Sequence, residues 1–105
     1  MVSTALSAGV TTRDDDRTVI WLDGEHDIAT VPALADTLAR AISADAAHLV
    51  IDLSGVKFIG AATIDELIRC RNRLCLESRT LTVRSPSRFA RRLLDLCGLT
   101  DVVET

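Results

Sequence analysis

The side chains best suited to acid–base chemistry in this sequence are two histidines, His26 and His48. His26 lies between Glu25 and Asp27, in a segment expected to form a loop, where flanking carboxylates would suit a general base. His48 is expected to begin a strand. A general base needs a group to activate, and no nucleophile is indicated near either histidine. We therefore predict that the protein is not an enzyme.

The three cysteines, Cys70, Cys75 and Cys97, are expected to be small apolar residues of the core or its boundary. Cys70 and Cys75 are five residues apart, which places them on different faces of a helix, and no nearby histidine completes a metal-binding set. The five glycines are scattered and form no phosphate-binding run. The sequence therefore predicts neither a metal site nor a cofactor.

A further candidate site is the junction Gly60-Ala61-Ala62-Thr63, which follows an apolar strand and precedes a helical pattern. Thr63 and Glu66 match a capping box, in which a threonine N-cap is followed three residues later by a glutamate that binds back to the backbone. Asp65 and Glu66 would also complement the positive end of the helix dipole. We interpret Thr63 chiefly as a helix start, a role that does not exclude binding a partner.

The strands that would position these residues follow from the hydrophobic pattern. Residues 6–14 and 17–25 are strand-like and flank a polar turn, which is typical of a hairpin. Residues 48–55 form a nearly continuous apolar run, as expected for a strand covered on both faces. Residues 79–85 and 99–104 are two shorter candidates.

Three helices are predicted near residues 30–43, 62–76 and 86–97. Thr30 is expected to cap the first helix, with Pro32 in its first turn, and Ser85 to cap the third, with Pro86 at its first position. Gly98 would end the third helix. The expected apolar stripes are Val31, Leu34, Leu38 and Ile42 in the first helix, Ile64, Leu67, Ile68, Leu74 and Cys75 in the second, and Phe89, Leu93, Leu94 and Cys97 in the third.

The resulting order is β-β-α-β-α-β-α, an α/β class with a mixed four- to five-stranded sheet packed by helices. We expect a single domain over residues 1–105, because a chain of this length can bury one core. The hairpin should be antiparallel, and the β-α-β crossovers should be right-handed with parallel strands.

Charge and composition narrow the classes of partner. The formal net charge is −3 and aromatic residues are only 3%, which disfavours nucleic acid. The charge is uneven: residues 1–55 carry three basic and nine acidic residues, net −6, and residues 56–105 carry nine and six, net +3. This asymmetry is typical of solvated helix faces, with a polar docking surface as the alternative. The first residues lack the features of a signal peptide, and we expect a cytoplasmic protein without membrane insertion.

Three segments in order resemble the STAS domain, and in particular bacterial anti-sigma factor antagonists. They are "DGEHDIATVPAL", "HLVIDLSGVKFIGAATIDEL" and "SPSRFARRLLDLCGLTDVVE". In that family a Gly-Glu-x-Asp turn leads into the first helix, as in Gly24-Glu25-His26-Asp27, and the last helix ends at a Gly-Leu step, as in Gly98-Leu99. The resemblance covers about residues 5–104.

The resemblance implies transcription regulation by partner switching. An unmodified antagonist binds an anti-sigma factor, typically a serine kinase, and a sigma factor is released. Phosphorylation of a serine at the start of the second helix abolishes binding, because a phosphate adds nearly two negative charges to a close-packed surface. The usual junction is Asp-Ser-Ser-Gly-Leu, and the phosphorylated serine falls on Ala61, which has no hydroxyl. Thr63, two places away, is a weaker candidate for modification.

The resemblance therefore implies a protein-binding module that docks on an anti-sigma factor or a related kinase-fold protein without the usual switch. We expect the partner to contact the loop at Asp27 and the junction Gly60, Ala61, Ala62, Thr63 and Ile64. The alternative is a STAS accessory subunit that binds the ATPase of an ABC transporter, for example a lipid transporter, or a larger signalling scaffold.

Overall fold

The computed structural model describes residues 8–14, 17–44 and 47–104. The strands are β1 (Ala8–Asp14), β2 (Arg17–His26), β3 (His48–Ile59) and β4 (Thr80–Arg84). The helices are α1 (Val31–Ser43), α2 (Ala61–Leu76) and α3 (Arg88–Leu96), with short 3-10 helices η1 (Ile28–Thr30) and η2 (Thr100–Val102). The element order confirms the predicted fold class.

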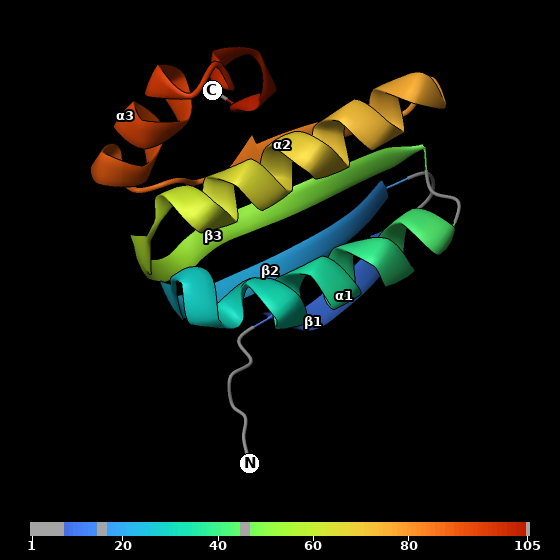
Figure 1. Cartoon of the computed structure of the whole chain (residues 1–105). Helices are drawn as coiled ribbons and strands as arrows, with labels where there is room; N and C mark the ends of the chain where they lie inside the picture. Colours follow the sequence, from blue (N-terminus) through green and yellow to red (C-terminus); the bar gives the residue numbers. More distant parts are fainter. Residues whose placement is uncertain (1–7, 15–16, 45–46, 105) are drawn as a thin grey trace.

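The four strands form one mixed sheet in the order β1-β2-β3-β4. β1 pairs antiparallel with β2, as the predicted hairpin requires, whereas β2, β3 and β4 are parallel neighbours. The hairpin turn at residues 15–16, like residues 6 and 7 of the first predicted strand, lies outside the described residues. In Figure 1, α3 and the C-terminal segment lie beyond the edge of the sheet that is opposite to β1.

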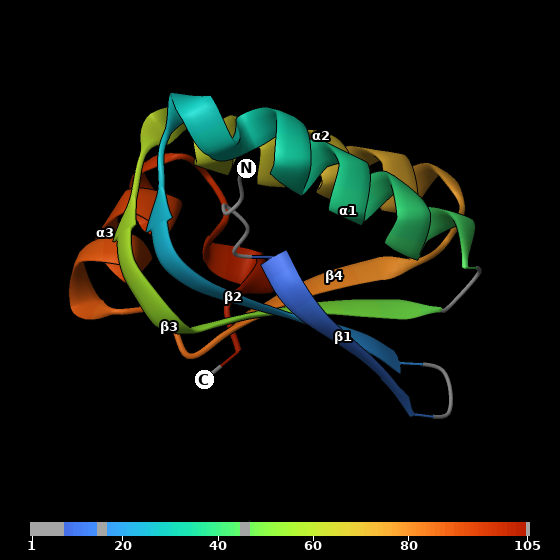
Figure 2. The same cartoon turned by 90° about the horizontal axis from the view of Figure 1, so that it is seen from below.

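One face of the sheet is covered by α1 and α2, which lie side by side across it, and the other face carries no helix in the described part of the chain (Figure 2). The core lies between these helices and the sheet. The predicted stripes of α1 and α2 supply most of it, although Cys75 of the second stripe is exposed. Burying each large aliphatic side chain stabilises the fold by about 1.5–3 kcal/mol. The fully buried side chains include Ile20, Leu34, Leu38, Ile51, Leu53, Ile64, Leu67 and Leu74.

The face without helices is held by a polar cluster across three strands. The buried Asp52 carboxylate accepts hydrogen bonds from the Ser54 amide (2.8 Å) and hydroxyl (2.6 Å) and from Arg84 Nε (2.8 Å). Burial alone would raise the pKa of Asp52, but the hydrogen bonds from Ser54 and Arg84 hold it below its usual value. The Arg84 guanidinium also stacks 4.9 Å from the Trp21 ring centroid. The cluster therefore ties β2, β3 and β4 together.

The third helix differs from its prediction at its start. It begins at Arg88, and its cap is Ser87, whose hydroxyl accepts from the Ala90 amide (3.0 Å). The predicted cap, Ser85, has a left-handed backbone (φ 57°), which is incompatible with capping a helix at Pro86.

The buried face of α3 also differs from its prediction. Ala90 and Leu94 face the core, whereas Phe89 is 60% exposed and Cys97 is exposed, so the predicted stripe was partly wrong. The last predicted strand is mostly wrong as well, because residues 100–102 form η2. Only Val103 makes a bridge, parallel to Val83.

None of the helices in the described ranges is long and apolar enough to cross a membrane.

The approach of β3 to β2 at Gly55 leads to a first prediction. The register of these strands shifts between Trp21 and Asp23, and a Cβ at Gly55 would lie 2.9 Å from Asp23 Cβ. Gly55→Ala should therefore lower the free energy of unfolding by about 1–2 kcal/mol, measured by urea denaturation. Lys57→Ala, an exposed position on the same strand, should change it by less than about 0.5 kcal/mol. Equal effects of the two substitutions would contradict this account.

Candidate functional site

Two strand ends meet at the candidate site. β2 and β3 are parallel, with His26 opposite Ile59, so the residues that follow them emerge at the same edge of the sheet. The Gly60 amide donates a hydrogen bond to the His26 carbonyl (2.9 Å). This bond brings the Asp27 loop beside the start of α2, at the left end of the molecule in Figure 1.

Asp27 caps the 3-10 turn η1. Its Oδ1 accepts from the Ala29 amide (3.0 Å), and its own amide donates to Thr30 Oγ1 (3.1 Å). Thr30 occupies the N-cap position of α1, as predicted, but the expected side-chain cap was wrong, because its hydroxyl makes no cap bond to α1 and completes the capping box of η1 instead. Asp27 is exposed, so a carboxylate fixed at one oxygen lies at the surface.

The predicted capping box at Thr63 was also wrong. α2 begins at Ala61 with Gly60 as its N-cap, and Thr63 is already inside the first turn, with its amide donating to the Gly60 carbonyl (3.1 Å). The helix starts early because the bond to His26 holds Gly60 in an extended conformation (φ −103°, ψ 173°). Glu66 pairs with Arg69 instead (3.0 Å). The Thr63 hydroxyl is fully buried and has no hydrogen-bond partner among the residues that the structure describes.

The predicted partner-contact residues divide by burial. Asp27 and Ala61 are exposed, and Gly60 and Ala62 are half-buried. Thr63 and Ile64 are each 0% exposed, so they can only support this surface from below.

Two exposed apolar side chains beside this surface were not predicted. Ile28 on η1 is 78% exposed, and Phe58 near the end of β3 is 46% exposed. The Phe58 ring lies next to Gly60, 3.6 Å from where a Cβ would be. The sequence did indicate that Ile28 could be exposed, because Ile28 lies outside the apolar stripe of the following helix.

His26 was expected in a loop, but it is the last residue of β2 and only 1% exposed. Its Nε2 donates to the Asp23 carbonyl (3.0 Å), so Nδ1 carries no proton when the ring is neutral. Nδ1 is buried and has no partner within the described part of the chain. Burial lowers the pKa of His26, outweighing the Asp23 carbonyl bond and the charges of Asp23 and Asp27. A ring so enclosed has no access to a substrate.

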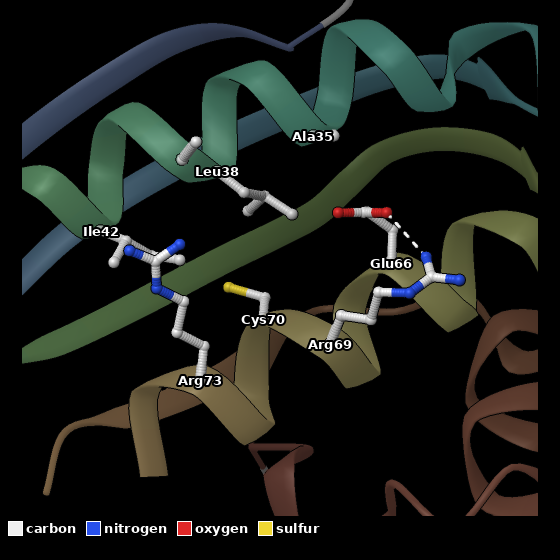
Figure 3. A pocket seen from close by; sticks show the side chains of 8 residues that line it. Ala35, Leu38, Ile42, Glu66, Arg69, Cys70 and Arg73 are labelled. Carbon is white, nitrogen blue, oxygen red and sulfur yellow. Dashed lines mark hydrogen bonds and ion pairs between the residues drawn. The ribbon is translucent and has the colours of Figure 1, made fainter. Parts of the chain in front are cut away.

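Of the three cysteines, only Cys70 fulfils the core prediction. It lies between α1 and α2 in a groove of about 140 Å³, with Arg69 and Arg73 beside it (Figure 3). Burial raises the pKa of the Cys70 thiol to about 11, so it stays protonated and unreactive. Cys75 and Cys97 are exposed, contrary to expectation. This groove follows the middle of α2, away from the helix start.

The sequence and this geometry both resemble those of known proteins. A family model described as "Mlab, STAS domain" matches residues 10–104. The chain belongs to the STAS domain family. Among curated proteins, no sequence matches it.

Solved structures agree with the assignment to the STAS domain. An anti-sigma factor antagonist from Mycobacterium paratuberculosis is 28% identical, with a TM-score of 0.80 over 93% of this chain and 87% of that one. SpoIIAA, an anti-sigma factor antagonist, is 18% identical in its unphosphorylated form, with a TM-score of 0.79 over 90% and 84%. The phosphorylated form of SpoIIAA, from Bacillus, is 15% identical, with a TM-score of 0.75 over 90% and 87%. The two SpoIIAA comparisons show the shared fold.

The buried imidazole of this STAS domain makes its stability depend on pH. The pKa of His26 is lower in the folded protein than its usual value of 6.5, so the unfolded chain binds more protons between the two values. The free energy of unfolding should therefore fall as the pH is lowered from about 7.5 to 5.5. Urea denaturation of the native protein and of His26→Gln checks this, since the variant should lose much of the dependence.

The second histidine, His48, begins β3 as predicted, and its resonances must be distinguished from those of His26 in an NMR titration. It is exposed and its Nδ1 lies 2.6 Å from Thr80 Oγ1. An NMR titration should give His26 a pKa below 6.5, and a value at or above 6.5 would contradict the role of burial.

Proposed function

We propose that this STAS domain is a non-enzymatic regulatory binding module of the anti-sigma factor antagonist kind. Its docking surface, as we define it, comprises Asp27, Ile28, Phe58, Gly60, Ala61 and Ala62. The partner is an anti-sigma factor or a related kinase-fold protein. The observation that carries the proposal is the Gly60–His26 hydrogen bond, which joins the two segments of this surface into one.

The chemistry of the docking surface suits a protein partner. Ile28 and Phe58 offer apolar area that would be desolvated on binding. Gly60, Ala61 and Ala62 between them carry little side chain, so a partner can approach the backbone closely. Asp27 adds a carboxylate that its cap bond to Ala29 holds in place, which would fix the partner's orientation.

The docking surface has no phosphate acceptor. Ala61, the exposed first residue of α2, has no hydroxyl, and the Thr63 hydroxyl is fully buried. A kinase needs its acceptor at the surface, so Thr63 could be modified only after α2 frays. We infer that the module stays permanently in its binding-competent form. Thr63 is therefore a poor phosphate acceptor because its hydroxyl is buried, and not because that hydroxyl caps the helix.

The similarity to an anti-sigma factor antagonist at 28% identity supports this choice of partner. The accessory-subunit alternative uses the same docking surface with the ATPase of a transporter. Affinity capture from the native organism, with a photo-crosslinking residue at position 61, distinguishes the two. A sigma-factor regulator supports the proposal, and a transporter ATPase replaces it by the alternative.

The first functional prediction places a charge at the centre of the docking surface. Ala61→Asp should weaken binding by about 2 kcal/mol or more, roughly 30-fold, because a carboxylate would be buried unpaired against the partner. The stability of the domain should hardly change, since an acid is tolerated at a helix N-terminus. Titration calorimetry against the captured partner and urea denaturation measure the two effects.

Arg73→Ala is the control for that experiment, because Arg73 lies about three turns farther along α2, in the groove beside Cys70. It should leave the affinity nearly unchanged. Equal affinities of the native protein and of folded Ala61→Asp would place the interface elsewhere.

The second functional prediction concerns phosphorylation. With a serine kinase of the anti-sigma class and ATP, the native protein should remain unlabelled at the junction. Ala61→Ser should become labelled, because position 61 is exposed at the start of α2. Intact-mass and peptide mass spectrometry locate the phosphate. Stoichiometric phosphate on Thr63 of the native protein would show that the acceptor has moved to that residue.

A further inference from the structure

The outer face of α3 is basic and partly apolar. Its three arginines, Arg88, Arg91 and Arg92, are exposed and form no ion pair with any described residue. Phe89 and Leu96 beside them are 60% and 78% exposed, and a shallow groove of about 300 Å³ is lined by Arg88, Phe89 and Arg92. The helix contains one acid, Asp95, so three arginines minus one aspartate leave a net charge of +2. We call this surface the α3 patch.

The end of β2 has the opposite character. Asp23, Glu25 and Asp27 are exposed and form no ion pair within the described ranges. His26 between them is buried, and burial favours its neutral form, so it does not offset their net charge of −3. The exposed Ile28 follows directly. We call these three carboxylates with Ile28 the acidic end of β2.

The two surfaces lie at one end of the molecule. In Figure 1, α3 and the turn before α1 are found at the same end, on opposite sides of the junction where β3 leads into α2. Figure 2 shows the same grouping from below. The half-exposed Phe58 belongs to the junction between them. Acidic, apolar and basic groups therefore follow one another across this end.

We propose that this end binds a second copy of the same chain as a two-fold symmetric dimer. A two-fold axis through the junction brings the acidic end of β2 of each copy onto the α3 patch of the other, so every ion pair occurs twice. The apolar residues Ile28, Phe58, Phe89 and Leu96 would lie at the centre. Both halves of the complementary pair belong to one chain, which favours a second copy over an unrelated acidic protein.

An anionic membrane is a poorer match for the α3 patch. Its exposed apolar part is two side chains on a nine-residue helix, and the whole chain carries a net charge of −3. A membrane would also leave the acidic end of β2 without a partner. The surface of one end is small, so we expect a weak dimer that forms at high micromolar concentration, with an affinity that falls as salt is added.

The dimer would cover the docking surface, so self-association and partner binding would exclude each other. This inference does not depend on the proposed function, because it requires only the chain itself. If the chain proves to be monomeric, the dimer is overturned but the proposed docking surface for a partner is not.

Charge reversal tests the dimer. Variant one is Arg88→Glu with Arg92→Glu, which changes the α3 patch from +2 to −2. Variant two is Asp23→Lys with Glu25→Lys, which changes the acidic end of β2 from −3 to +1. Each variant alone juxtaposes like charges and should weaken association at least tenfold, as measured by sedimentation equilibrium over roughly 1 μM to 1 mM. Mixed in equal amounts, the two variants should form a heterodimer, because both contacts again join opposite charges.

The control is Arg40→Glu with Arg73→Glu, which carries the same charge change on α1 and α2 and should associate like the native protein. Circular dichroism establishes that all variants are folded. A native chain that is monomeric throughout the range overturns the proposal, as does a mixture that stays monomeric or a mass that grows beyond two copies. Binding of the native protein to anionic vesicles, lost in variant one and without any dimer, would assign the α3 patch to a membrane instead.

Discussion

The hydrogen bond from the Gly60 amide to the His26 carbonyl determines the arrangement of the functional end. It extends the parallel pairing of β2 and β3 to the last residue of β2 and holds Gly60 extended. The helix must then begin at Ala61, which puts an alanine at the surface and Thr63 inside. The same bond fixes where Asp27 leaves the sheet. One backbone contact thus sets the positions of both segments of the proposed docking surface.

Within residues 8–14, 17–44 and 47–104, two buried side-chain atoms at this end of the domain have no hydrogen-bond partner, His26 Nδ1 and Thr63 Oγ1. Thr18 Oγ1 is the third such atom among the described residues. A buried polar atom without a partner costs about 1–3 kcal/mol, and such atoms are rare in folded proteins. Local rules are most often broken where a surface serves a function. Two of the three atoms, those of His26 and Thr63, therefore lie beneath the proposed docking surface.

The order of strands and helices was predictable because hydrophobic periodicity is a local property. Leu34 and Leu38 in α1, like Ile64 and Leu67 in α2, are at helical spacing and are buried as expected. The mixed sheet followed from the hairpin and the crossovers. Charge asymmetry between the halves of the chain was visible as well, although its placement on α3 and at the end of β2 required the fold.

The start of α1 was predictable, since the helix begins directly after Thr30 as expected. The caps of α2 and α3 were not, since they depend on backbone conformation and on contacts that the local pattern does not contain. Thr63 matches a capping box locally, but His26, far earlier in the chain, decides that Gly60 is the cap. The sequence suggests Ser85 as the cap of α3, but its left-handed backbone excludes that role. The exposure of Phe58 depends on which neighbours cover the strand end.

The polar cluster on the face without helices has a practical consequence. Trp21 is the sole tryptophan of the chain, and its ring is partly exposed under the Arg84 guanidinium, which Asp52 holds from the next strand. Its fluorescence therefore reports whether β2, β3 and β4 remain assembled. Because the ring lies on the sheet rather than on η1, α2 or α3, we expect its emission to follow the integrity of the sheet more than binding at the far end. The molecule thus carries an optical probe that separates unfolding from association.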